Sequence, residues 1–169
     1  MEHPGTHKVS FTGSVPTGIA VGRSAMGAGL TRATLELGGK NAAGFLRDMD
    51  VDKAVGGIIE AGFLHSGQIC AAAERFFVHR SQIDAVLDTL SQRLSALNIG
   101  SPLDERTEFG PVTHRQHQQK LLGYINQARA ENNTIIHGGN LIERPGSYFE
   151  PTVIPVSYTH LRAHETKAN

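Results

Sequence analysis

The sequence predicts an α/β fold in which parallel strands alternate with helices. Short runs of β-branched and aromatic residues alternate with longer segments whose apolar residues recur at spacings of three and four. Hydrophobic residues make up 39% of the chain and charged residues 19%, which is typical of a globular protein. Because a helix between two strands favours parallel strand pairing, we expect parallel pairs.

Strands are expected in four places before residue 80, each rich in β-branched or aromatic side chains. They are KVSFT (8–12), RATLEL (32–37), NAAGFL (41–46) and RFFVH (75–79). Between the first two, GSVPTG (13–18) predicts a turn, and IAVGRSAMGA (19–28) predicts a helix that its glycines weaken.

Two helices with N-terminal capping patterns are expected in the middle of the chain. Asp50 is placed to cap a helix that begins near Val51. Ser81 and Asp84 form a capping-box pattern before a helix over 82–97. The apolar side chains of each segment would form one face of the helix.

The third capping pattern and two further strands are expected nearer the C-terminus. Thr113 with Gln116 predicts the start of a helix over 114–131. TIIH (134–137) and YFEPTVI (148–154) predict the last strands, with a glycine turn after the first of them.

Charge and cysteine content exclude several classes of protein. The chain has 16 basic residues (Lys plus Arg) and 16 acidic residues (Asp plus Glu), so its charges balance. An excess of positive charge, which would indicate nucleic acid or a membrane surface as a partner, is absent. The single cysteine, Cys70, excludes an intrachain disulfide and a multi-cysteine zinc site. We expect no metal, since His160 and His164 lack a third ligand. The first residues lack the apolar stretch of a signal peptide, so a cytoplasmic location is expected.

FTGSVPTG (11–18) combines a strand end, glycines and a helix start. Gly13 and Gly18 would let the backbone bend and approach a ligand, and the N–H groups at the helix start would favour an anion such as a pyrophosphate. The spacing G-x-x-x-x-G differs from the common dinucleotide fingerprint. A plain strand-to-helix turn is the alternative.

Cys70 lies in FLHSGQICAAAE (63–74), where small neighbours leave room for a substrate. If a helix followed the turn, its N-terminus would favour the thiolate, which is the nucleophilic form. A buried structural cysteine is one alternative. A cysteine hydrolase that uses His65 is another, although such an enzyme usually takes its histidine from a distant segment.

Glu36 is a single acid between two leucines in TLELGGKNAAGF (34–45). An ion pair with Lys40, or exposure to solvent, would give it a structural role only. The apolar context favours a different role, because desolvation makes a carboxylate harder to ionise and therefore a better base near neutral pH.

Three segments, taken together and in this order, resemble the NAD(P)-dependent aldehyde dehydrogenases: FTGSVPTG, LELGGKNA and FLHSGQICAAAE. Cys70 follows Glu36 by 34 positions, a spacing that is typical of the family. The resemblance runs from about His3 to Ile154. Within the family, the blocks look most like bacterial phenylacetaldehyde dehydrogenases, with betaine aldehyde and general aliphatic aldehyde enzymes as alternatives.

The resemblance implies a role for each matching residue. Cys70 would be the nucleophile that forms a thiohemiacetal and then a thioester, and Glu36 the base that activates water. Gly13, Ser14 and Gly18 would receive the pyrophosphate of NAD or NADP, and Leu37 would lie beside the nicotinamide. The substrate would be an aldehyde and the full-length protein a homo-oligomer.

The resemblance also divides the chain into three parts. Residues 1–38 would be the last strand, turn and helix of a Rossmann-like coenzyme domain, and residues 39–154 part of the three-layer catalytic domain. Residues 155–169 lie outside the resemblance, and VSYTHLRAHET in them resembles a translated sequencing adapter. We therefore expect a fragment that is inactive alone, with a natural non-catalytic binding or assembly module as the alternative.

Overall fold

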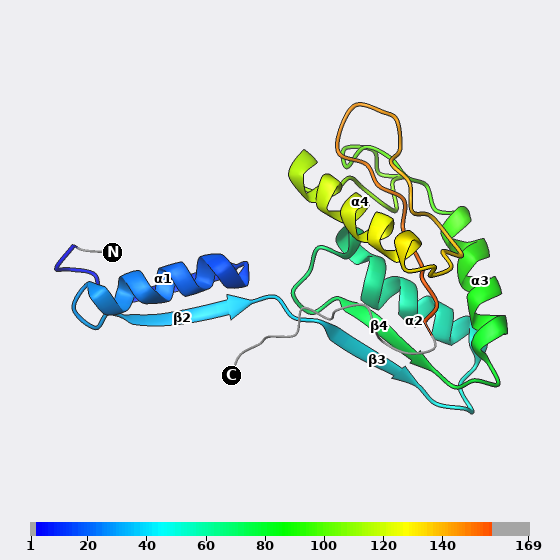
Figure 1. Cartoon of the computed structure of the whole chain (residues 1–169), viewed down its shortest axis with the longest axis horizontal. Coiled ribbons are helices and arrows are strands. Elements are labelled where there is room, and N and C mark those ends of the chain that lie inside the picture. The colour runs from blue at the N-terminus through cyan, green and yellow to red at the C-terminus, as the bar shows by residue number, and fades with distance from the viewer. Residues whose placement is uncertain (1–2, 157–169) are drawn as a thin grey trace. The chain divides into compact units, whose positions relative to one another are not determined.

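The computed structural model describes residues 3–156, and the chain forms two compact units (Figure 1). The N-terminal unit is Met1–Gly39 and the C-terminal unit is Lys40–Asn169. The boundary is within two residues of the expected division after residue 38. The identities of the two parts as coenzyme and catalytic domains stay predictions. No helix within 3–156 has the length and hydropathy that a membrane crossing requires.

The N-terminal unit is a pair of parallel strands with one helix between them in sequence. The elements are β1 (Lys8–Gly13), α1 (Val15–Gly27) and β2 (Arg32–Leu37). The two strands pair in parallel from Lys8 opposite Arg32 to Gly13 opposite Leu37. Both strands and their parallel pairing confirm the expectation, and Figure 1 shows α1 lying along β2.

Helix α1 begins at Val15, four residues earlier than expected, so the turn predicted over 13–18 is mostly helix. Ser14 is the N-cap residue, and its Oγ accepts a hydrogen bond from Thr17 N at 3.4 Å. Pro16 fits within the first turn because the N–H that it lacks would have no partner inside the helix there.

The C-terminal unit places two helices over a second pair of parallel strands. The elements are β3 (Asn41–Phe45), α2 (Val51–Phe63), a short 3₁₀ segment (Leu64–Gly67), β4 (Ala73–Val78), α3 (Ile83–Ser95) and α4 (Arg115–Ala130). Strands β3 and β4 pair in parallel, with an irregularity in the register between Asn41 and Ala42. The parallel prediction is confirmed for this pair too.

The core of the C-terminal unit lies between α2 and α3, with the sheet packed against it. Its buried side chains come from the apolar faces that the sequence predicts, and they are Val55, Ile58, Val86, Leu90 and Leu94. Phe45 of β3 and Phe76 of β4 pack against this cluster, with ring centroids 6.3 Å apart. The periodic apolar residues thus do what their spacing predicts.

Of the three capping patterns, only the one at Asp50 is confirmed. Asp50 Oδ1 accepts from Lys53 N at 3.0 Å and α2 begins at Val51. The pattern at Ser81 is wrong, because Ser81 Oγ bonds with His79 Nδ1 at 2.8 Å instead. Helix α3 begins at Ile83, after Gln82, which makes no side-chain capping bond.

The cap predicted at Thr113 is also wrong. His114 is the N-cap residue of α4, and its Nδ1 accepts from His117 N at 3.1 Å. Thr113 donates its backbone N–H to Gln68 Oε1 at 2.8 Å, so the threonine bonds a distant residue and does not cap the helix. A side chain with several possible partners is not assigned by sequence spacing alone.

The two C-terminal strands that the sequence predicts are reduced to single bridges. His137 pairs with Val153, and Leu141 with Phe149, both antiparallel. Between these bridges Gly138 and Gly139 have φ of 71° and 88°, which turns the backbone out of the extended conformation. A continuous ladder therefore does not form over 134–137 and 148–154.

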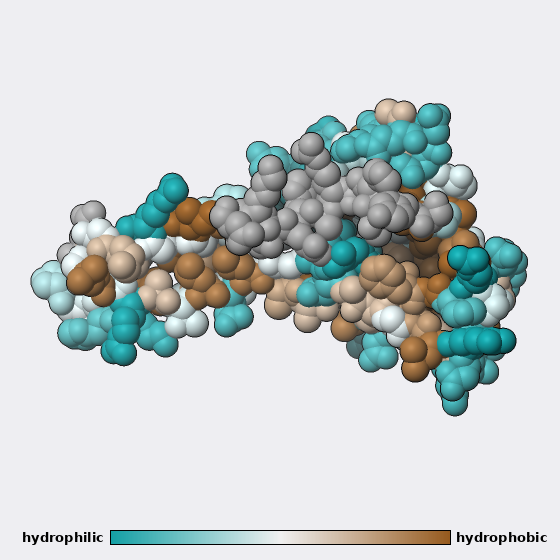
Figure 2. Space-filling view, turned by 60° about the horizontal axis from the view of Figure 1, so that its bottom comes forward, coloured by the Kyte–Doolittle hydropathy of each residue, from teal (hydrophilic) through white to brown (hydrophobic). Residues whose placement is uncertain are grey.

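Several large apolar side chains remain exposed on both units, and Figure 2 shows apolar surface (brown) between polar side chains (teal). Leu46 is 76% exposed and Phe77, on β4, is 53% exposed. Scattered apolar exposure is usual for a folded protein, so this surface by itself assigns no partner.

The packing predicts how two leucines differ in their contribution to stability. Leu94 is 1% exposed in the core cluster, whereas Leu103 is 95% exposed. Leu94→Ala should lower the free energy of unfolding by about 2–5 kcal/mol, because it removes buried apolar contacts and leaves a cavity. Leu103→Ala, the matched control, should change it by less than about 0.5 kcal/mol. Urea unfolding followed by circular dichroism measures both, and equal effects would contradict the assigned core.

The surroundings of His117 on helix α4 predict that the free energy of unfolding decreases in weak acid. Burial lowers the pKa of His117 from its ordinary value, and the nearby Lys120 and His114 lower it further. The unfolded chain therefore takes up a proton at this site before the folded chain does, as the pH falls through about 6.5. The free energy of unfolding should decrease from pH 7 to pH 5, and His117→Gln should make this decrease smaller. Identical pH dependence of the two proteins would refute the assignment.

Candidate active site

Cys70 lies in an exposed turn between α2 and β4. The turn is closed by Ala72 N, which donates to Ile69 O at 3.0 Å. The thiol residue is exposed, which excludes the buried structural cysteine among the sequence alternatives. An exposed thiol in a turn can reach a small electrophile, as a nucleophile must.

The segment before this turn has an unusual backbone. His65, Ser66 and Gly67 have φ of 53°, 56° and 73°, so three consecutive residues are left-handed. For residues other than glycine this conformation is disfavoured and persists only where surrounding contacts hold it. The chain therefore leaves α2 abruptly and turns towards β4.

The segment after Cys70 enters a strand and not a helix. Ala73 begins β4 and is paired with Asn41 of β3. The expectation that a helix N-terminus would act on the thiol is therefore wrong. The small residues after Cys70 belong to a turn and to the first position of a parallel strand.

Two side chains fasten the Cys70 loop to the segment before α4. Ser66 Oγ donates to Gly110 O at 2.9 Å. Gln68 Oε1 accepts from Thr113 N at 2.8 Å and also bonds the Thr113 hydroxyl. These bonds hold the left-handed segment, so the position of the loop is fixed from outside the loop.

Asn41, at the start of β3, fastens the other side of the loop. Its Nδ2 donates to Cys70 O at 2.7 Å and to Ala72 O at 3.1 Å. Sequence reasoning missed both Asn41 and Gln68. Their nearness to the recognised motifs was the available signal, since Asn41 directly follows GGK and Gln68 precedes Cys70 by two positions.

Lys40 does not pair with Glu36, which was one of the two structural alternatives for that acid, the other being exposure to solvent. The Lys40 ammonium pairs with Glu74, just beyond the Cys70 turn. The Lys40 carbonyl accepts from Arg75 Nη2 at 2.8 Å. The segment that follows the Glu36 motif therefore contacts the segment that follows Cys70.

Glu36 lies on β2 in the N-terminal unit and is exposed, so the expected apolar surroundings are not found. The reason is the alternation of side chains along a strand. Its neighbours Leu35 and Leu37 are half-buried, and each lies against a glycine of α1. Glu36 therefore points to the opposite face of the strand pair.

The glycine loop at the start of α1 works differently from the expectation. Gly18 is in the first turns of the helix, where a Cβ would lie 2.6 Å from Leu37 Cδ2. Gly18 thus permits close packing of α1 on β2 and does not bend the backbone. Gly13 is the last residue of β1, and neither glycine has a positive φ.

The start of α1 nevertheless suits an anion. Ser14 supplies the cap, and the first turn carries no acidic side chain, so the partial positive charge of the helix end is not neutralised by a carboxylate. Backbone N–H groups at such a position bind phosphate well. Gly13, Ser14, Gly18 and Leu37 all lie in the N-terminal unit, which fits a cofactor site there as a prediction.

His65 does not form a visible dyad with the thiol in the described residues. Its carbonyl oxygen accepts from Gln68 N at 3.2 Å, and its backbone is left-handed. No three His, Cys, Asp or Glu side chains gather as metal ligands within 3–156. His160 and His164 lie outside the described residues.

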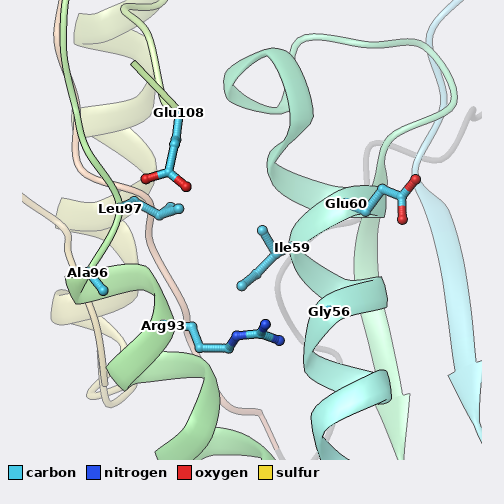
Figure 3. A pocket seen from close by; sticks show the side chains of 7 residues that line it. All are labelled: Gly56, Ile59, Glu60, Arg93, Ala96, Leu97 and Glu108. Carbon is cyan, nitrogen blue, oxygen red and sulfur yellow. The ribbon is translucent and has the colours of Figure 1, made fainter. Parts of the chain in front are cut away.

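A separate open groove lies between α2 and α3, with Glu108 beyond the end of α3 (Figure 3). Its lining residues are Gly56, Ile59, Glu60, Arg93, Ala96, Leu97 and Glu108. Arg93 points towards α2, and its Nη1 donates to Asp52 O at 3.3 Å. The lining includes none of the candidate site residues.

Comparison with known proteins supports the resemblance over most of the chain. The model of the aldehyde dehydrogenase family matches residues 1–166. This range runs into the stretch from Pro155, whose origin stays a prediction. The chain is 41% identical to betaine aldehyde dehydrogenase of Sinorhizobium fredii over 156 aligned residues, with 90% of this chain and 32% of that protein covered. It is 39% identical to mitochondrial 10-formyltetrahydrofolate dehydrogenase of Homo sapiens, with 90% of this chain and 16% of that protein covered.

Solved structures are similar in fold as well. Aldehyde dehydrogenase from Bacillus cereus, in its NAD+ complex, has a TM-score of 0.83 and 34% identity, with 88% of this chain and 30% of that chain covered. Betaine aldehyde dehydrogenase from Staphylococcus aureus, in complex with NAD+, has a TM-score of 0.82 and 38% identity, with 88% and 30% covered.

The chain spans about a third of the length of the betaine aldehyde dehydrogenases that it matches. Within that third, the family match, the relatives and the fold agree with the three ordered motifs. The chain belongs to the aldehyde dehydrogenase family.

Proposed function

We propose that the whole protein oxidises an aldehyde to a carboxylic acid with NAD or NADP, using Cys70 as the nucleophile and Glu36 as the general base. The exposed Cys70 thiol, in a turn that is fastened on two sides, is the observation that carries this proposal. A nucleophile has to be both accessible and held in place, and this turn meets both requirements.

The chemistry proceeds through a covalent intermediate on Cys70. The thiolate adds to the aldehyde carbonyl carbon, and a C–S bond forms. The aldehydic hydrogen then leaves with its electron pair, and a thioester remains on Cys70. NAD or NADP, when bound, accepts that hydride. Glu36 takes a proton from water as the water attacks the thioester, and breakage of the C–S bond releases the acid and the thiolate.

The cofactor would bind to the N-terminal unit. Gly13 and Ser14 precede the uncompensated start of α1, where the pyrophosphate would receive backbone N–H groups. Gly18 and Leu37 are in close contact, so they would shape one wall together, with the nicotinamide beside Leu37. The NAD+ complexes of the Bacillus cereus and Staphylococcus aureus enzymes support this cofactor class.

We propose phenylacetaldehyde as the aldehyde, on the overall likeness of the blocks around Glu36 and Cys70. Betaine aldehyde is the second candidate, favoured by the relative from Sinorhizobium fredii at 41% identity. The ratio of kcat/KM for the two aldehydes, measured on the whole protein, decides between them.

The proposed cellular location follows from the chemistry of the thiol. A reducing compartment such as the cytoplasm keeps the lone thiol reduced. With equal numbers of acidic and basic residues, nucleic acid and membrane surfaces are not proposed as partners. The whole protein is proposed to be a homo-oligomer.

The roles of Cys70 and Glu36 predict different kinetic defects. Residues 3–154 would replace the matching segment of the Sinorhizobium fredii relative, and NADH formation would be followed from the first turnover. Cys70→Ala should abolish both the initial burst and turnover, by about 10⁴-fold or more. Glu36→Gln should keep the burst, which precedes hydrolysis, and slow turnover about 10²- to 10⁴-fold.

Glu143→Gln is the control for this pair, because Glu143 is an exposed acid outside the candidate site. It should leave both phases unchanged. A burst and turnover that survive Cys70→Ala would refute the proposed function, and a burst lost in Glu36→Gln would refute the role of this acid in hydrolysis.

The 169-residue chain alone is proposed to have no dehydrogenase turnover, since it spans about a third of its relatives. Purified chain, NAD and phenylacetaldehyde or betaine aldehyde should give no increase in absorbance from NADH above that of the Cys70→Ala variant. A steady rate that depends on Cys70 would contradict this prediction.

A further inference from the structure

The Cys70 turn has two carbonyl oxygens that face one side chain. The oxygens of Cys70 and Ala72 lie 2.7 and 3.1 Å from Asn41 Nδ2. A side-chain amide nitrogen carries two hydrogens, so one Asn41 amide can donate to both carbonyls at once. At this position an aspartate of the same shape could accept only, and an alanine could do neither.

Asn41 is itself held in place by its neighbours. Its backbone pairs with Ala73 at the start of the β3–β4 ladder, and the register is irregular directly after it. The preceding residue, Lys40, pairs with Glu74 and accepts from Arg75 through its carbonyl. Three contacts made by Lys40 and Asn41 therefore join the start of β3 to the segment that follows Cys70.

The bond to the Cys70 carbonyl restricts the backbone at the nucleophile. Fixing that carbonyl fixes the peptide plane after Cys70, and the Ala72 N to Ile69 O bond closes the turn from its other end. With the backbone held on both sides, the thiol can change direction mainly by rotation about its own Cα–Cβ bond. A held nucleophile needs less reorganisation to reach its reacting geometry.

We propose that Asn41 is a positioning residue for the Cys70 nucleophile, acting through the Cys70 and Ala72 carbonyls. The catalytic meaning of this role rests on the proposed function, whereas the contact itself does not. Asn41 and Cys70 lie in the same compact unit, so the inference does not depend on the N-terminal unit.

Alkylation of the intact chain by iodoacetamide tests the proposal, because Cys70 is the only cysteine and the rate reports on it alone. Asn41→Ala removes both hydrogen bonds and should lower the rate constant at least about fivefold, which corresponds to the loss of one ordinary hydrogen bond. Asn41→Asp should move the midpoint of the pH–rate profile to higher pH, because it puts a negative charge against the backbone carbonyl of the residue that ionises. Asn41→Gln, which keeps the amide, should restore the wild-type midpoint.

Asn98 offers the matched control. Its Nδ2 also donates to a backbone carbonyl in the same unit, that of Arg106, at 2.8 Å. Asn98→Ala and Asn98→Asp should leave the rate and the midpoint of Cys70 alkylation unchanged. Folded Asn41 variants with wild-type rates and midpoints would overturn the proposal, and so would equal effects of the Asn98 variants.

If the Asn41 variants do not fold, a measurement on the unaltered chain tests whether Asn41 bonds the two carbonyls. Scalar couplings across hydrogen bonds should join Asn41 ¹⁵Nδ2 to the carbonyl carbons of Cys70 and Ala72. The coupling from Asn98 to Arg106 is the internal standard. Absence of both Asn41 couplings when the standard is visible would overturn the proposal. Neither experiment uses an aldehyde or NAD, so failure of the proposed dehydrogenase function would be seen separately.

Discussion

The parallel pairing of β3 and β4 is the constraint on which the C-terminal unit depends. Parallel neighbours need a crossover, and α2 supplies it by carrying the chain from the end of β3 back to the start of β4. The two strand starts are therefore neighbours. This brings Lys40 and Asn41, which precede Cys70 by 30 and 29 residues, against Glu74 and Cys70 respectively.

The crossover also explains why a disfavoured backbone can persist beside Cys70. The side of α2 that faces α3 is buried, so the helix cannot shift to relax the residues that follow it. His65 and Ser66 take left-handed conformations there, and bonds from Ser66 and Gln68 to the 110–113 segment hold them. Apolar packing fixes the end of the helix, and a few polar bonds then fix the loop.

In the N-terminal unit a glycine serves close packing of a helix on a strand and not backbone flexibility. At Gly18 the absence of a side chain lets α1 approach Leu37, because a Cβ there would collide with it. This contact orients β2, and the alternation of the strand then sends Glu36 to the other face. The same two elements thus supply a helix start suited to an anion and an exposed carboxylate.

The sequence by itself determined the strands β1 to β4, the apolar faces of α2 and α3, and the family, because these depend on local periodicity and on the order of motifs. Tertiary structure alone decided the partners of the polar side chains that bond distant residues, whereas the local cap at Asp50 was predictable from the sequence. Thr113 bonds Gln68 and does not cap α4, Lys40 pairs with Glu74 and not with Glu36, and Asn41 bonds the Cys70 carbonyl. A polar side chain bonds whichever partner the fold brings near, and sequence spacing does not contain that information.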